Sequence, residues 1–159
     1  MEYERLKVPV HKQWEVMESL VVKGLVKGIG VSNFNVQLLN DLLSYANIPP
    51  ATNEVELHPL CVQKNLVSFC LKEGVLPIGY CPLARGEDKR IANPLETEPV
   101  KKAAEKYGKT PGQVVLNWGL TRGYAVIPKS EKKHRQIENL GAAGWSLSAE
   151  EVEEIAALN

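Results

Sequence analysis

The chain has 159 residues, with 19 basic and 19 acidic side chains and therefore a formal net charge of zero. This length suits one domain, and the balanced charge argues against a nucleic-acid-binding surface, which would need clustered basic residues. A hydrophobic fraction of 44% and a charged fraction of 24% are ordinary for a globular protein and argue against disorder, collagen and coiled coil.

Four short segments are expected to form buried strands, because each is apolar or alternating and is bounded by glycine, proline or polar residues. They are residues 27–33, 52–57, 75–80 and 124–129. Their centres, near positions 30, 54, 78 and 126, are separated by 24, 24 and 48 residues. This is the period of one strand plus one helix, with one interval of double length.

Helical patterns fill the intervals between these strands. Apolar residues recur at helical spacing over residues 13–26, 35–46 and 62–73, and residues 1–12 are expected to form an irregular lead-in. The long interval holds two helices, of which the first begins near Pro99. Strands and helices that alternate in this way predict a parallel sheet covered by helices.

Capping signals mark the later helices. Thr110 with Gln113 forms a capping box, with a proline at the first helical position between them, and Ser148 with Glu151 forms another. A further helix is expected to begin after Ser130. Residues 84–98 form the long irregular stretch of the sequence, either a functional loop or a solvated surface loop.

Polar residues stand where the strands end, and ligand sites of parallel α/β proteins lie at the carboxyl ends of strands. Each residue also has a structural interpretation: Ser32 can cap the next helix, Glu54 can face solvent, and Tyr80 can belong to the core. The candidates at these ends are Ser32, Asn33, Asn53, Glu54 (or Glu56), Tyr80, Cys81, Lys129 and Ser130.

The segment after the last strand carries the strongest candidate site. Ser130 can cap a helix whose N-terminus offers N–H groups to an anion, and Lys129 adds positive charge. Arg135 can bind a phosphate or stack on adenine. Glu138 and Asn139 share its helix face and can bind the adenine edge. The pattern predicts a phosphate-and-adenine clamp, with an ordinary solvated basic helix start as the alternative.

Several common nucleotide and catalytic motifs are absent from the sequence. Gly28 and Gly30 lie inside a predicted strand, and no third glycine completes a dinucleotide fingerprint. No P-loop, HExxH or G-x-S-x-G occurs either. A nucleotide clamp in this chain therefore needs a fold other than a Rossmann domain.

The three cysteines predict free thiols in a reducing compartment. Cys61, Cys70 and Cys81 are nine and eleven residues apart and match no C-x-x-C pattern. The pair His58 and Cys61 lacks a second pair of ligands, so no metal site is expected. No apolar run approaches the roughly 20 residues of a membrane span, and no signal peptide is recognised. We expect a cytoplasmic protein with no nucleic-acid or membrane partner.

Four motifs in this order resemble the aldo/keto reductase family. Residues 28–34 (GIGVSNF) resemble its G-x-S-N-F strand end, and residues 53–59 (NEVELHP) resemble its N-Q-V-E-x-H-P segment. Residues 80–83 (YCPL) resemble its Y-S-P-L turn, and residues 127–139 resemble its I-P-K-S-x-x-x-x-R-x-x-E-N signature. The likeness extends over residues 14–158. It implies a TIM (β/α)8 barrel of which this chain, as one partial NADP-dependent oxidoreductase domain, carries the C-terminal half, similar to strands five to eight plus a C-terminal helix.

The resemblance implies that the chain binds NADPH, with NADH as the less favoured cofactor. Ser32 and Asn33 would contact the nicotinamide carboxamide, and Tyr80 would stack on the nicotinamide ring. Residues 81–85 would contact the pyrophosphate, and the residues of the clamp would hold the 2′-phosphate and adenine. The implied cofactor-binding residues are Ser32, Asn33, Glu54, Tyr80, Cys81, Leu83, Arg85, Lys129, Ser130, Arg135, Glu138 and Asn139.

The sequence also departs from the family pattern. Glu54 stands where the family has Gln, and Cys81 replaces a Ser. A carboxylate can accept a hydrogen bond from the carboxamide but cannot donate one. His58 belongs to the H-P turn and is interpreted as structural. The catalytic Asp, Tyr, Lys and His of the family come from the first four strands, so no residue here is assigned a catalytic role.

Two functions follow from these sequence features. The first is NADPH-dependent reduction of aldehydes or ketones, with this chain as the cofactor-binding half. It would be inactive alone and would meet a small carbonyl substrate only when the other half is supplied. The alternative is a non-catalytic module that binds a nucleotide or forms a homodimer through the open half-barrel face.

Overall fold

The computed structural model of the chain describes residues 7–84 and 93–159, in which strands and helices alternate as the sequence predicts. The elements in chain order are α1 (Val10–Val22), β1 (Gly30–Ser32), α2 (Val36–Tyr45), β2 (Thr52–Glu56), α3 (Lys64–Lys72), β3 (Leu76–Tyr80), η1 (Pro94–Glu96), α4 (Glu98–Tyr107), α5 (Pro111–Thr121), β4 (Ala125–Val126), α6 (Lys133–Leu140) and α7 (Ala149–Ala156). No helix in these described ranges is long and apolar enough to cross a membrane.

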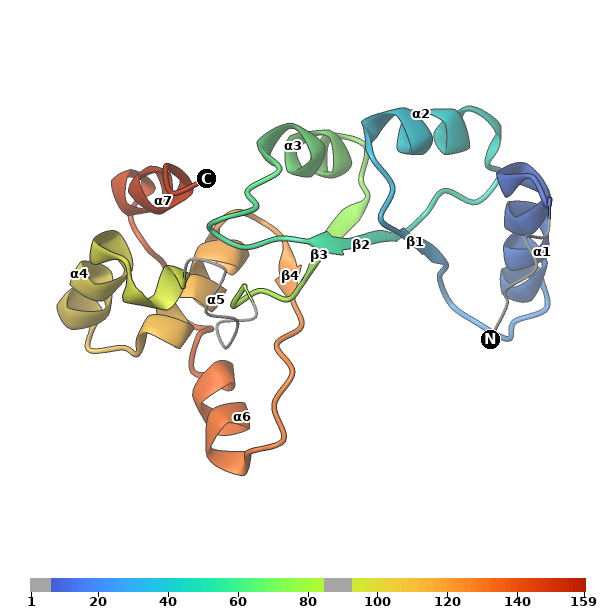
Figure 1. Cartoon of the computed structure of the whole chain (residues 1–159). Coiled ribbons are helices and arrows are strands. Elements are labelled where there is room, and N and C mark those ends of the chain that lie inside the picture. Colours follow the sequence, from blue (N-terminus) through green and yellow to red (C-terminus); the bar gives the residue numbers. More distant parts are fainter. Residues whose placement is uncertain (1–6, 85–92) are drawn as a thin grey trace.

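The four strands form one parallel sheet in the order β1-β2-β3-β4. Ser32 of β1 pairs with Glu54 of β2, and Glu56 of β2 pairs with Tyr80 of β3. Figure 1 shows α2 and α3 along one side of the sheet, α1 beyond β1, and α6 extending away from the strands. The strands β1 and β4 are the two edges, and they are shorter than predicted because each has one neighbour to pair with.

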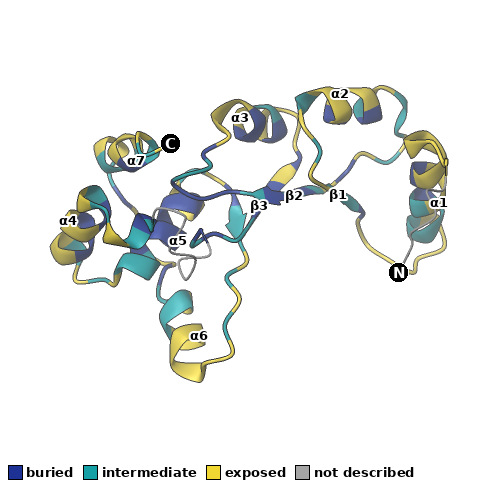
Figure 2. Cartoon of the chain, in the orientation of Figure 1, coloured by how far each residue is buried: buried dark blue, intermediate teal, exposed yellow. Residues whose placement is uncertain are grey.

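The core lies between the sheet and its helices, where Figure 2 shows the buried residues. Leu39, Leu57, Val100, Val114 and Trp118 are completely buried there. A smaller cluster of Trp14, Ile29 and Leu42 packs α1 and α2 against the start of β1. Burying a side chain of this size stabilises the fold by about 1.5–3 kcal/mol. The helix-facing side of the sheet is therefore the side that holds the fold together.

The two faces of the sheet differ in exposure. In β2, Asn53 and Val55 are buried on the helix side, while Thr52, Glu54 and Glu56 are partly exposed on the opposite side. Alternation of this kind follows from the two-residue period of a strand. The side of the sheet that none of the described helices covers therefore carries Ser32, Glu54 and Tyr80.

Both predicted capping boxes are confirmed. The Thr110 side chain accepts from the Gln113 N–H, and the Gln113 side chain accepts from the Thr110 N–H. Ser148 and Glu151 exchange the same pair of hydrogen bonds at the start of α7. These bonds satisfy N–H groups that a helix start would otherwise leave unpaired, and they fix where α5 and α7 begin.

Glu151 also ties α7 to α4. Its carboxylate accepts hydrogen bonds from Lys106 Nζ at 2.7 Å, from Tyr107 Oη at 2.8 Å and from the Ser148 N–H at 2.8 Å. Burial by itself would raise the pKa of Glu151, but these donors outweigh it and hold the pKa at about 2. The carboxylate is therefore ionised at neutral pH, where it keeps the two helices joined.

One helix boundary differs clearly from the prediction. The first helix spans Val10–Val22 rather than residues 13–26, so the expected irregular lead-in is already helical from Val10. Gly24 follows the helix with φ 69°, and the Leu25 N–H donates to the Leu20 carbonyl. This is a Schellman motif, for which glycine is the favoured residue. The helix therefore ends at Val22, four residues before the predicted end at residue 26.

Candidate functional site

Residues from three neighbouring strands are joined by hydrogen bonds toward the carboxyl end of the sheet. Ser32 Oγ and the Asn33 N–H both donate to the Glu54 carbonyl oxygen, and the donor–acceptor distance is 2.9 Å in each bond. Tyr80 Oη donates to Asn33 Oδ1 at a distance of 3.1 Å. Ser32 and Asn33 are exposed, and Tyr80 is partly exposed. The structure therefore brings together four of the predicted site residues, with polar groups and one aromatic ring open to solvent.

A buried asparagine, which the sequence places at a strand end without assigning it a cofactor contact, holds this arrangement. Asn53 is completely buried, accepts from the Phe34 N–H at 3.3 Å and donates to the Phe34 carbonyl at 2.9 Å. These bonds fix the turn in which Asn33 takes a left-handed conformation with φ 59°. The sequence does contain a signal for this structural role, because Asn53 is a polar residue on the buried and otherwise apolar face of its strand.

Left-handed residues also shape the end of β3. Cys81 has φ 47° and Ala84 has φ 54°, conformations that cost a non-glycine residue about 1 kcal/mol each. Both therefore depend on the surrounding structure to hold them, as is common near functional sites. Cys81 and Leu83 are partly buried directly after the strand, whereas the predicted contact Arg85 lies outside the described residues.

Glu56 and His58 form a pair next to Tyr80. The Leu60 N–H donates to His58 Nδ1 at 3.2 Å, so the ring proton lies on Nε2 and points to Glu56 Oε1 at 3.3 Å. Burial lowers the pKa of His58 and outweighs the opposing effect of Glu56, which keeps the imidazole neutral at pH 7. His58 lies in a buried turn with Cys61, and this placement supports its structural interpretation.

The basic segment after β4 corrects one prediction. Ser130 does not cap α6: the helix begins at Lys133, its N-cap is Lys132, and no side chain caps it. The physical reason is local, because Ser130 Oγ accepts from the Lys132 N–H at 3.2 Å and so closes a turn ahead of the helix. The first N–H groups of α6 consequently have no capping side chain, which suits an anion site.

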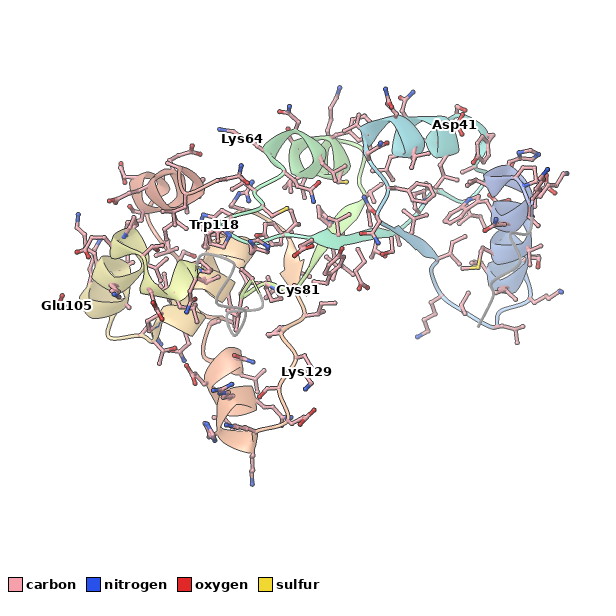
Figure 3. The ribbon with its side chains drawn as sticks, viewed as in Figure 1. Asp41, Lys64, Cys81, Glu105, Trp118 and Lys129 are labelled. Carbon is pink, nitrogen blue, oxygen red and sulfur yellow. The ribbon has the colours of Figure 1, made fainter. Side chains whose placement is uncertain are left out.

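The charged residues of this segment differ in how exposed they are and in the contacts that they make. Lys129 lies between β4 and α6, where Figure 3 labels it, and pairs with the neighbouring Glu131. Arg135 is exposed on α6, and Asn139 is partly exposed. Glu138 accepts from Thr110 Oγ1, and this bond ties α6 to the start of α5. Arg135, Glu138 and Asn139 therefore share α6, whereas Lys129 and Ser130 precede it, and Glu138 also has a structural contact.

Both groups of residues lie toward the carboxyl ends of the strands, as parallel topology requires. Two cavities of the described structure are lined by other residues. One of about 340 Å³ is lined by Trp14, Glu18 and Tyr45, and one of about 480 Å³ lies between the starts of α2 and α3. The candidate site is therefore an open surface on the uncovered side of the sheet.

Comparison with known proteins identifies related chains. The model of the family described as "Aldo/keto reductase family" matches residues 4–159 of the chain. A probable NAD(P)H-dependent D-xylose reductase of Aspergillus flavus is 45% identical over 159 residues, which cover 94% of this chain and 50% of that protein. Aldose reductase B of Dictyostelium discoideum is 45% identical over 152 residues, covering 96% of this chain and 48% of that protein.

Solved structures agree with the sequence comparison. An aldo-keto reductase complexed with NADPH superimposes with a TM-score of 0.92 at 32% identity, covering 99% of this chain and 50% of that one. The aldose reductase of Schistosoma japonicum gives 0.88 at 35% identity, covering 97% of this chain and 49% of that one. The chain thus spans about half the length of the relatives it matches, and its four strands correspond to half of their TIM barrel.

Proposed function

Because the chain belongs to the aldo/keto reductase family, we propose that it is the cofactor-holding half of an NADPH-dependent reductase of aldehydes or ketones. The observation that carries this proposal is that Ser32, Asn33, Tyr80 and the Glu54 carbonyl form one hydrogen-bonded group toward the carboxyl ends of three adjacent strands. Two relatives are named for NAD(P)H-dependent or aldose reduction, and one solved neighbour holds NADPH.

The residues present fit this cofactor. The exposed hydroxyl and amide of Ser32 and Asn33 suit a carboxamide, and the partly exposed ring of Tyr80 suits a flat heterocycle. The uncapped start of α6, together with Lys129 and Arg135, suits a phosphate. Bound NADPH would supply the hydride for a carbonyl carbon.

Reduction of a carbonyl also needs an acid that protonates its oxygen. Among the described residues at the strand ends, Tyr80 donates its hydroxyl proton to Asn33, and His58 donates to Glu56. We therefore assign neither of them as the acid. The proposal places the acid–base group in the other half of the barrel, where the resemblance puts Asp, Tyr, Lys and His.

A titration of the purified chain with NADPH, followed by the cofactor's fluorescence, tests this division of roles. Saturable binding is expected, together with no turnover when a simple aldehyde is added. A chain that fails to bind NADPH would contradict the cofactor-holding role. Turnover of the aldehyde by this chain alone would contradict the assignment of the acid to the other half.

We infer a second candidate function, self-association, from the open side of the half-barrel. In the described part of the chain, the edge strands β1 and β4 each have a neighbour on one side only. Leu76 of β3 and Ile127 after β4 are 43% and 46% exposed. Ile137 and Leu140 of the outer helix α6 are 61% and 79% exposed. A twofold axis along the barrel axis would join β4 of one copy to β1 of the next and close eight parallel strands.

Sedimentation equilibrium measures this association directly. The expected result is a mass twice 17.6 kDa, and Ile127→Asp should restore the single mass because it places a charge in the joint. Leu71→Asp, on α3 and 43% exposed, is the matched control and should leave the dimer intact. A single mass at every concentration would contradict self-association without affecting the proposed cofactor role.

A further inference from the structure

One carboxylate of the candidate site has no cation partner among the described residues. Glu54 lies in the middle of β2, paired with Ser32 on β1 and with Ile78 on β3. Its backbone carbonyl is engaged by Ser32 and Asn33, but within residues 7–84 and 93–159 no ion pair includes its side chain. The side chain is partly exposed on the uncovered face of the sheet. A negative charge therefore stands open in the site.

This charge lies next to the groups proposed to hold the nicotinamide. Paired residues of parallel strands share a face, so Glu54 lies on the same face as Ser32, on a strand about 4.8 Å away. Two residues further along β2, Glu56 pairs with Tyr80, which places Glu54 and Tyr80 on that face as well. Glu56 is engaged by His58, whereas Glu54 has no comparable donor in the described structure.

We propose that Glu54 makes the site bind oxidised NADP⁺ in preference to NADPH. The inference rests on the proposed function, because it needs the nicotinamide at these strand ends. The nicotinamide ring is positively charged when oxidised and uncharged when reduced. A carboxylate a few ångströms away attracts the first form and has no charge to attract in the second. Glutamine would bind both forms alike, since it has the same shape and no charge.

The preference has a measurable size. At an effective dielectric constant of about 20 to 80, charges separated by about 6 Å attract each other enough to change an equilibrium by roughly three- to hundredfold, and we take about tenfold as the expected value. A tenfold preference for the oxidised form corresponds to about 30 mV for a two-electron couple. Bound NADPH would therefore be a stronger reductant in this chain than in a variant with glutamine at position 54.

Calorimetric titrations with NADP⁺ and with NADPH, each on three proteins, test the proposal. The proteins are the natural chain, Glu54→Gln, and Glu105→Gln as the control. Glu105 is exposed on α4, far from the strand ends in Figure 3, so its replacement removes one charge without touching the site. Preference for NADP⁺ over NADPH should fall about tenfold in Glu54→Gln and stay unchanged in Glu105→Gln.

The outcomes separate this inference from the function on which it rests. If Glu54→Gln changes the affinities for NADP⁺ and NADPH equally, the inference is overturned. Position 54 would then act only through a hydrogen bond to the carboxamide, which both forms of the cofactor contain. The same loss of preference in Glu105→Gln would also overturn it, since net charge alone would then explain the effect. If the natural chain binds neither form, the proposed function fails and this inference fails with it.

Discussion

Replacing Lys129 and Arg135 together by alanine is expected to weaken NADPH binding about 100-fold. Each charge-assisted hydrogen bond to a phosphate contributes about 1.5 kcal/mol at an exposed site, and the two together therefore account for about two powers of ten. NADH lacks the 2′-phosphate, so its affinity should change by no more than about threefold. Fluorescence titration with both cofactors measures the two effects on the same samples.

A matched double variant separates the effect of where the two positive charges lie from the effect of removing any two positive charges. Lys132→Ala with Lys133→Ala removes two positive charges from the same helix start, and both lysines are exposed. This control should weaken NADPH binding much less than the Lys129 and Arg135 pair does. Equal losses in the two double variants would contradict a specific 2′-phosphate contact, and so would an equal loss of NADH affinity.

The strands and the helix caps could be predicted because they depend on local chemistry. A Thr, a Pro and a Gln at fixed spacing satisfy the N–H groups of α5 whatever surrounds that helix. The same reasoning failed at Ser130, where a turn to the Lys132 N–H competes with capping. Both arrangements use the same serine hydroxyl, and the sequence alone does not distinguish which N–H it meets.

The parts of the site that join distant segments could not be predicted from spacing. Asn53 reaches Phe34 across two strands, and Thr110 reaches Glu138 from another helix. Such contacts depend on the relative placement of elements that lie 19 and 28 residues apart in the chain. The strand ends were predicted as a site because parallel topology alone brings them to one edge.

Replacing Asn117 by alanine is expected to lower the free energy of unfolding by about 4 kcal/mol. Asn117 is 1% exposed in α5, and its Nδ2 donates to the Ala142 carbonyl at 2.9 Å and to the Trp145 carbonyl at 2.7 Å. Its Oδ1 accepts from the Leu147 N–H at 3.1 Å. Alanine would leave these buried backbone groups without partners, at about 1–3 kcal/mol each. Urea unfolding of the two proteins measures the difference.

We expect the Asn117→Ala substitution to disturb the cofactor site as well, because it changes the position of α6. No residue of α6 is buried, so its position depends on contacts at its C-terminal end, where Thr110 and Gln113 hold Glu138 and where Asn117 holds Ala142. Where the variant is still folded, we therefore expect its preference for NADPH over NADH to fall. Asn65→Ala, exposed on α3, is the control and should change neither quantity. A stability loss below about 1 kcal/mol would show that Asn117 is not the anchor of this segment.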